Sequence, residues 1–204
     1  LLKKGFTGPI HATPATIDLC SVMLPDSAHI QEMEVENLNR RNAQRGRPTV
    51  SPIYSLSDVA ACLLQFRSVE YAAWTTILAG VRARFWNAGH MLGSSSVEIE
   101  VASEQVEPPL RILFSGDIGP DHKLFHPDPE GPAGVDVVVC EATYGGRQRP
   151  TVEPARRRAL FAAEVNAALD AGGVLLIPSF AVERTQEQRR RDQQHQGQRH
   201  LGNH

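Results

Sequence analysis

The sequence has few cysteines, few aromatic residues and no long apolar run. Its 204 residues include three cysteines, and aromatic residues make up 6% of the chain. No apolar stretch approaches the roughly 20 residues of a membrane-spanning helix, so we expect no membrane association. Cys20, Cys62 and Cys140 show no paired spacing. This favours reduced, mostly buried thiols over a disulfide framework and predicts a cytoplasmic protein.

An excess of charge of either sign is also missing. Lysine and arginine number 21 against 23 aspartates and glutamates, giving a net charge of −2. A chain this close to neutral creates no field that attracts nucleic acid by itself, although a nucleic-acid substrate stays compatible with it. The apolar fraction of 41% and the charged fraction of 22% are those of an ordinary globular protein with one domain or two small ones.

Helices are predicted in the first third of the chain and again near residue 165. Thr13 is the expected N-cap of the first helix, and Pro25 predicts its break. A second, charged helix is expected over residues 27–45, and Ser57 is the expected N-cap of a short third one. The last predicted helix has apolar residues on one face and ends at Gly172.

Strands are predicted in the middle of the chain. The continuous apolar run 136–140 predicts a central strand covered on both faces, and residues 174–178 predict a further buried strand. From residue 186 the composition turns polar, which predicts a solvated tail. The pattern as a whole predicts an α/β fold. The remaining predicted strands are residues 81–86, 96–101 and 111–114.

Three loops at predicted strand ends carry residues of types that bind metals. His90 and Asp117 each lie in a glycine-containing loop, where the backbone can turn sharply and a ligand can approach closely. Glu141 directly follows the run 136–140. If they converge, one imidazole and two carboxylates suit a hard or borderline divalent metal.

Each of the three residues also has a simpler interpretation. His90 could be a hydrogen-bonded structural imidazole, Asp117 a turn former and Glu141 a surface acid. A phosphate-binding loop at His90 is disfavoured, because no lysine and no helix follow the glycines.

The order and spacing of several short motifs are more specific than any single residue. Together they resemble the β-CASP branch of the metallo-β-lactamase superfamily, which comprises RNA- and DNA-processing nucleases, including relatives of the nuclease subunit of the cleavage and polyadenylation factor. The resemblance covers essentially residues 1–187. The matching motifs are GFTGPI (5–10), DSAHIQE (26–32), AGHMLGS (88–94), FSGDIG (114–119), EATYG (141–145) and PSFAVERTQ (178–186).

The resemblance implies a fold and a division into domains. The fold would be a partial metallo-β-lactamase αββα sandwich, with two sheets face to face and helices outside, followed by the start of a β-CASP insert. Residues 1–147 would form the partial metallo-β-lactamase domain and residues 148–187 the start of the β-CASP domain. Residues 188–204 would be a polar, disordered tail.

The resemblance also implies roles for the three loop residues. His90 would bind one zinc ion, Asp117 would bridge two, and Glu141 would orient the site without binding metal. Asp117 and Glu141 would be the catalytic residues. Two zinc ions would clamp the scissile phosphate and activate a water molecule, so the expected reaction is hydrolysis of single-stranded RNA by an endo- or exoribonuclease.

Part of the family's metal site does not occur in this sequence. The HxHxDH motif of the family precedes its GFTGPI motif, and no His-x-His is present in the 204 residues. A catalytic zinc ion needs about three protein ligands. We therefore expect these residues to be a fragment of the enzyme, truncated at both ends, that binds zinc weakly or not at all and lacks nuclease activity on its own.

Two other functions were weighed against this interpretation. A non-catalytic pseudo-nuclease could bind RNA or an active nuclease partner, but a decayed enzyme usually substitutes its ligands in place, whereas His90 and Asp117 are intact. A hydrolase of small esters or lactams is disfavoured by the motifs 141–145 and 178–186, which are typical of the nuclease branch. A monomer and a homodimer both stay open.

Overall fold

The structure is a computed structural model that describes residues 2–103, 106–121, 127–148, 152–172 and 174–176. The chain divides into two compact units, residues 1–141 and 142–204. The predicted tail, the motif 178–186 and the two histidines at positions 122 and 126 lie outside the described residues. In the part of the chain that is described, no helix has the length and apolar character needed to cross a membrane.

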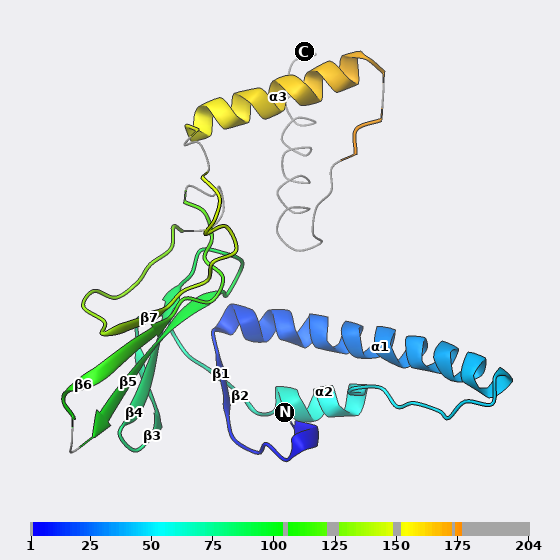
Figure 1. The fold of residues 1–204 in the computed structure, drawn as a ribbon, viewed down its shortest axis with the longest axis horizontal. Coiled ribbons are helices and arrows are strands. Elements are labelled where there is room, and N and C mark those ends of the chain that lie inside the picture. The colour runs from blue at the N-terminus through cyan, green and yellow to red at the C-terminus, as the bar shows by residue number, and fades with distance from the viewer. Residues whose placement is uncertain (1, 104–105, 122–126, 149–151, 173, 177–204) are drawn as a thin grey trace, which may run out of the picture. The chain divides into compact units, whose positions relative to one another are not determined.

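The first unit contains a five-stranded sheet (Figure 1). Its strand order is β3-β4-β5-β6-β7, antiparallel from β3 to β6, with β7 parallel to β6. Together with the helices this confirms the predicted mixed α/β fold, which is consistent with part of a metallo-β-lactamase fold. The strands are β3 (Trp74–Leu78), β4 (Val81–Asn87), β5 (Ser95–Ser103), β6 (Val106–Phe114) and β7 (Val137–Val139).

Alternation along β4 and β5 decides which side chains share a face. Ala83 pairs with Ile99 and Arg84 with Glu98, so apolar and charged pairs occupy opposite faces. Ala83 is 5% exposed and belongs to the core. The predicted strands in this part of the chain are confirmed, whereas β3 and the short strand β2 (Phe66–Ser68) were not predicted.

Two predictions about buried strands are wrong. Strand β7 is the last strand of the sheet order, and its three valines are 44–55% exposed. A continuous apolar run shows that both faces of a strand are apolar, but it does not show what covers them. Residues 174–176 form no strand, and Val174 is 98% exposed. The helix before them, α3 (Pro154–Asp170), is present as predicted.

The helical part of the first unit joins the two strands of a small parallel sheet. Strand β1 (Ile10–Ala12) pairs with β2, and a short 3-10 helix, η1 (Leu2–Lys4), precedes β1. Between β1 and β2 the chain forms α1 (Pro14–Gln44) and α2 (Leu56–Leu63). Thr13 caps α1 as predicted, because its hydroxyl accepts a hydrogen bond from the Thr16 backbone N–H.

The predicted break at Pro25 is wrong, because α1 continues through it. Proline lacks the N–H that would bond to the carbonyl four residues earlier, which costs one helical hydrogen bond. Tertiary contacts directly after the proline hold the next turn. Ala28 is fully buried, and the Tyr54 hydroxyl donates to Ser27 Oγ at 2.7 Å.

The N-cap of helix α2 lies two residues before the predicted cap at Ser57. This N-cap is Ser55, whose hydroxyl accepts from the Asp58 backbone N–H at 3.3 Å. The Asp58 carboxylate accepts in return from the Ser55 backbone N–H at 2.8 Å, which completes a capping box. Hydrogen bonds from the backbone and hydroxyl of Ser55 hold the pKa of Asp58 below its ordinary value, and Lys3 contributes further.

The cysteines are free but differ in burial. Cys20 and Cys62 are half-buried, whereas Cys140 is exposed, so the prediction of mostly buried thiols is wrong for Cys140. Burial raises the pKa of the Cys20 thiol, and the neighbouring Cys62 raises it further.

The capping box makes a prediction that separates the two serines. Ser55→Ala removes the acceptor for the Asp58 N–H and should lower the free energy of unfolding by about 1 kcal/mol. Ser57→Ala is the matched control, because it leaves that hydrogen bond in place. Urea denaturation followed by circular dichroism measures both. An equal or larger loss for Ser57→Ala would contradict the assignment of the cap.

Candidate functional site

Three strands of the sheet end at the same edge. Strand β5 is antiparallel to both β4 and β6, and β7 is parallel to β6, so β4, β6 and β7 run in one direction. The loops that follow these strands contain His90, Asp117 and Glu141, respectively. Strand direction alone therefore brings the loops of all three predicted site residues to one edge of the sheet.

The loop of Asp117 lies directly on the loop of His90. The Gly119 backbone N–H donates to the Ala88 carbonyl at 2.8 Å. Gly119 is buried, and a Cβ atom added to it would overlap the carbonyl oxygen of Gly89. The two backbones are so close that only glycine fits at position 119.

The side chain of Glu141 fixes the same loop from the side of β7. Its carboxylate accepts from the Ile118 backbone N–H at 2.7 Å, next to Asp117. The Glu141 backbone N–H donates to Ser115 Oγ at 2.9 Å, and the Ser115 N–H donates to the Val139 carbonyl at 2.9 Å. Glu141 therefore orients the backbone that carries Asp117.

The loop of His90 is held by its own serine and by the start of α1. The His90 backbone N–H donates to Ser94 Oγ at 3.1 Å. The hydroxyls of Thr13 and Thr16 both bond to the Gly93 carbonyl at 2.9 Å. Thr13 is 1% exposed, so this contact lies in the interior and fixes the loop to the first turn of α1.

The donor groups at this edge fit only part of a zinc site. His90 and Asp117 are exposed, and Glu141 is half-buried. Throughout residues 2–103, 106–121, 127–148, 152–172 and 174–176, no group of three or more His, Cys, Asp or Glu side chains could hold a metal ion. A catalytic zinc ion needs about three protein ligands. The described residues therefore do not complete such a site.

The other described histidines, His11 and His29, come from other elements. His11 is half-buried on β1, and His29 is exposed on α1. Neither belongs to the loops that follow β4, β6 and β7.

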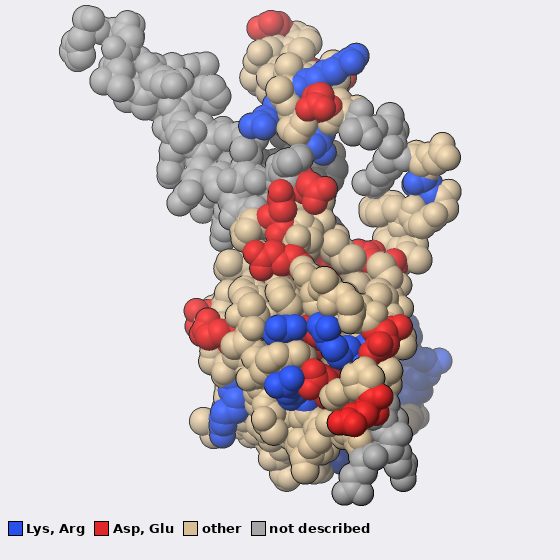
Figure 2. Space-filling view, turned by 90° about the vertical axis from the view of Figure 1, so that its left-hand side faces the viewer, with Lys and Arg blue, Asp and Glu red and all other residues tan. Residues whose placement is uncertain are grey.

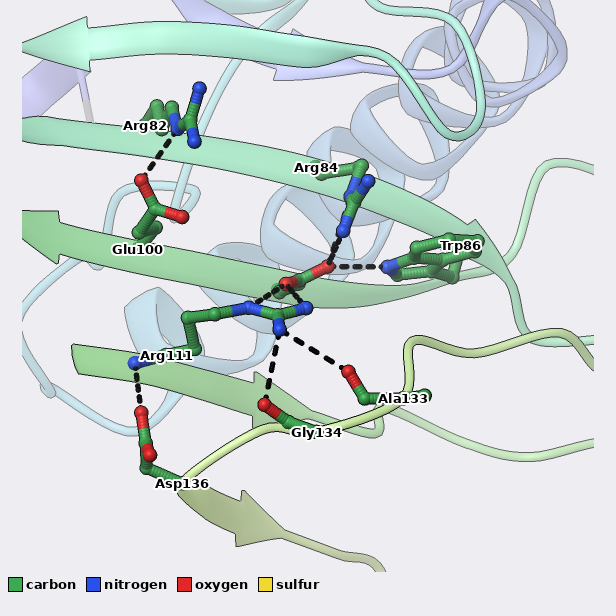
Figure 3. A network of polar contacts seen from close by, with 9 residues as sticks. Arg82, Arg84, Trp86, Glu100, Arg111, Ala133, Gly134 and Asp136 are labelled. Atoms are coloured by element: carbon green, nitrogen blue, oxygen red, sulfur yellow. Dashed lines mark hydrogen bonds and ion pairs between the residues drawn. The ribbon is translucent and has the colours of Figure 1, made fainter. Parts of the chain in front are cut away.

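Sequence reasoning missed a buried carboxylate on β5, the strand between β4 and β6. Glu98 on β5 is 0% exposed. Its Oε2 accepts from Arg84 Nε at 3.0 Å and from Trp86 Nε1 at 2.8 Å, and its Oε1 accepts from Arg111 Nε at 2.8 Å (Figure 3). Burial alone would raise the pKa of Glu98, but the hydrogen bonds from Trp86, Arg111 and Arg84 outweigh it and hold the pKa below its ordinary value.

Arg111 extends this network to the segment before β7. Its Nη1 donates to the carbonyls of Ala133 and Gly134 at 3.2 and 3.0 Å (Figure 3). Its backbone N–H donates to the Asp136 carboxylate at 2.7 Å. One arginine thus contacts both the buried Glu98 and the chain that enters β7.

The charges on this face of the sheet balance each other. Arg82 pairs with Glu100 at 2.7 Å, and the guanidinium groups of Arg82 and Arg84 each lie 4.3 Å from the centre of the Trp74 ring. Figure 2 looks onto the side where Figure 1 shows the sheet, and acidic and basic side chains are intermixed there. Such a surface is not a basic nucleic-acid groove.

Sequence comparison finds relatives over most of the chain, although no family model matches it. Ribonuclease TTHA0252 of Thermus thermophilus is 32% identical over 188 residues, which cover 92% of this chain and 37% of that protein. Transcription termination factor FttA of Thermococcus kodakarensis is 30% identical over 188 residues, covering 90% of this chain and 26% of that protein. Endoribonuclease YSH1 of Gibberella zeae is 30% identical over 190 residues, covering 92% and 20%, respectively.

Two of these relatives are named as ribonucleases and the third as a transcription termination factor. The chain spans 37%, 26% and 20% of the length of the three proteins, respectively.

The contact between the two loops predicts the effect of one added methyl group. Gly119→Ala should lower the free energy of unfolding by about 1–3 kcal/mol, because the new Cβ overlaps the Gly89 carbonyl and the loops must separate. Gly131→Ala is the matched control, since its Cβ would meet no atom within 4 Å. Equal stability of the two variants in urea denaturation would contradict the contact.

The buried carboxylate predicts how stability depends on pH. Glu98→Gln should lower the free energy of unfolding at pH 7 by about 2–4 kcal/mol, because it leaves the half-buried guanidinium groups of Arg84 and Arg111 without their carboxylate. Since the folded-state pKa of Glu98 is lowered, its contribution is present above the ordinary pKa of about 4.3 and is lost as the pH falls through the folded value. Urea denaturation at pH 7 and pH 3 should therefore show the variant approaching the wild type at pH 3. A gap that stays constant would contradict this assignment.

Proposed function

We propose that the chain belongs to the β-CASP branch of the metallo-β-lactamase superfamily and forms part of a zinc-dependent ribonuclease. One observation carries the proposal. The loops of His90, Asp117 and Glu141 are joined by hydrogen bonds at one edge of the sheet, in a chain that is similar over nine tenths of its length to two proteins named as ribonucleases and one named as a transcription termination factor. The order of the sequence motifs supports the same family.

The proposal gives each of the three residues a separate role. His90 and Asp117 offer an exposed imidazole and an exposed carboxylate, the donor types that zinc accepts. Glu141 holds the backbone next to Asp117, so it acts by orienting that carboxylate. The remaining metal ligands are assigned to residues outside the described set, because the described residues contain no group of three ligands.

The proposed substrate is single-stranded RNA. Recognition of RNA requires either basic side chains that contact phosphates or aromatic platforms that stack on bases. The chain carries a net charge of −2, and charges are intermixed on the face seen in Figure 2. We therefore assign most of the RNA-binding surface, like the missing ligands, to residues outside the described set.

The test uses the whole reading frame that contains these residues in its own genome. The purified product is expected to hydrolyse single-stranded RNA with added zinc, and chelation should abolish the reaction. His90→Ala and Asp117→Ala should lower kcat/KM at least about a hundredfold, and Glu141→Gln should lower it about 10–100-fold, as removal of an orienting group does. His29→Ala is the control and should stay within about twofold of the wild type, because His29 is exposed on α1.

Two outcomes of this experiment would contradict the proposal. RNA binding without cleavage would support the non-catalytic pseudo-nuclease. Cleavage that survives both His90→Ala and Asp117→Ala would overturn the assignment of the site.

The 204 residues on their own give a further prediction. Because the described part of the chain offers fewer ligands than a catalytic zinc ion requires, we expect weak zinc binding and no multiple-turnover cleavage of RNA. Isothermal titration with zinc and a cleavage assay measure the two quantities. Stoichiometric, tight binding together with cleavage would show that the 204 residues contain a complete site.

A further inference from the structure

The carboxylate of Glu98 connects the strands that carry all three site loops. On the basis of the proposed function, we infer that Glu98 is a positioning residue of the site, which sets the loops of His90 and Asp117 at their mutual distance. It lies on β5, between β4 and β6, and each of its two oxygens serves one of these neighbours.

One oxygen fixes the strand that leads to His90. Glu98 Oε2 accepts from Trp86 Nε1 at 2.8 Å and from Arg84 at 2.9–3.0 Å. Trp86 pairs with Ser96, and the Ser96 hydroxyl donates to the Ser115 carbonyl at 2.7 Å. The hydrogen bond from the Trp86 indole therefore acts on the end of β4, two residues before the Ala88 carbonyl that receives the other loop.

The other oxygen fixes the strand that leads to Asp117. Glu98 Oε1 accepts from Arg111 Nε at 2.8 Å and from Arg111 Nη2 at 2.5 Å, so two N–H groups of one guanidinium converge on a single carboxylate oxygen. Arg111 also holds the segment before β7 through two backbone carbonyls and the Asp136 carboxylate. A change at Glu98 is therefore transmitted to β6 and to the entry of β7.

A carboxylate can serve both sides, whereas the isosteric amide cannot. Glutamine keeps one acceptor oxygen and replaces the other by an NH2 group, which cannot accept a hydrogen bond from arginine or indole N–H. Glu98→Gln thus keeps the shape of the side chain and breaks its link to either β4 or β6. Glu100→Gln is the matched control, because Glu100 has the same face and strand and pairs with Arg82.

Amide hydrogen exchange tests the positioning without requiring activity. In Glu98→Gln the amides of Gly119 and Ile118, which bond to Ala88 and Glu141, should exchange at least tenfold faster. The Ala102 amide, bonded to the Gly80 carbonyl at the β3–β4 turn, is the reference for the general loss of stability expected of this variant, and its acceleration should be at least tenfold smaller than that at Gly119 and Ile118. Equal acceleration at all three amides would show a purely structural role and overturn the inference.

A milder variant covers the case in which Glu98→Gln does not fold. Trp86→Phe keeps an aromatic ring and removes the indole donor to Glu98. It should accelerate exchange at Gly119 by at least threefold relative to Ala102. An unchanged ratio in this variant would also overturn the inference.

Kinetics on the whole reading frame link the positioning to the reaction. Glu98→Gln should lower kcat at least tenfold with KM within twofold, because the loops are misplaced while the RNA-binding surface is untouched, and Glu100→Gln should leave both unchanged. An unchanged kcat would overturn the inference. Absence of cleavage in the wild type would instead overturn the proposed function, and the exchange result would still decide whether Glu98 positions the loops.

Discussion

A backbone contact between two glycine loops is the constraint on which the candidate site depends. Gly119 donates to Ala88 and leaves no room for a side chain against Gly89, so the loops of His90 and Asp117 cannot move independently. The contact forms only if β4 and β6 keep their register on β5, in which Asn87 pairs with Ser95 and Phe114 with Val97. That alignment is set one strand away, where Glu98 bonds to both neighbours of β5.

The parts that could be predicted from the sequence are those that depend on local chemistry. The alternation of apolar and polar residues predicted β4 and β5, and the pair Thr13-Pro14 predicted the start of α1. The glycines around Asp117 predict a sharp turn and the close approach of a ligand, whereas the structure shows the backbone of a second loop against Gly119. The relation of those loops to each other required the strand order, which no local pattern contains.

The predictions that failed depend on contacts distant in the sequence. Pro25 stays inside a helix because the next turn is held by tertiary contacts. Strand β7 is the last strand in the order of the sheet, although its sequence suits a central strand. One feature of the sequence could have predicted the hydrogen-bond network of Glu98. Arg84 and Glu98 sit at charged positions of alternating strands that pair in register, a pattern that indicates cross-strand ion pairs.

The hydrogen bonds between the start of α1 and the loop of His90 restrict where related proteins can differ in length. Helix α1 bonds to the loop of His90 through its N-cap Thr13 and through Thr16 in its first turn. The helix has 31 residues, so its far end lies about 45 Å along the axis from that contact. Lengthening or shortening α1 and the connection 45–55 leaves the loop in place. Evolutionary drift in length is therefore expected to accumulate at that end of the helix, while the first turn is constrained.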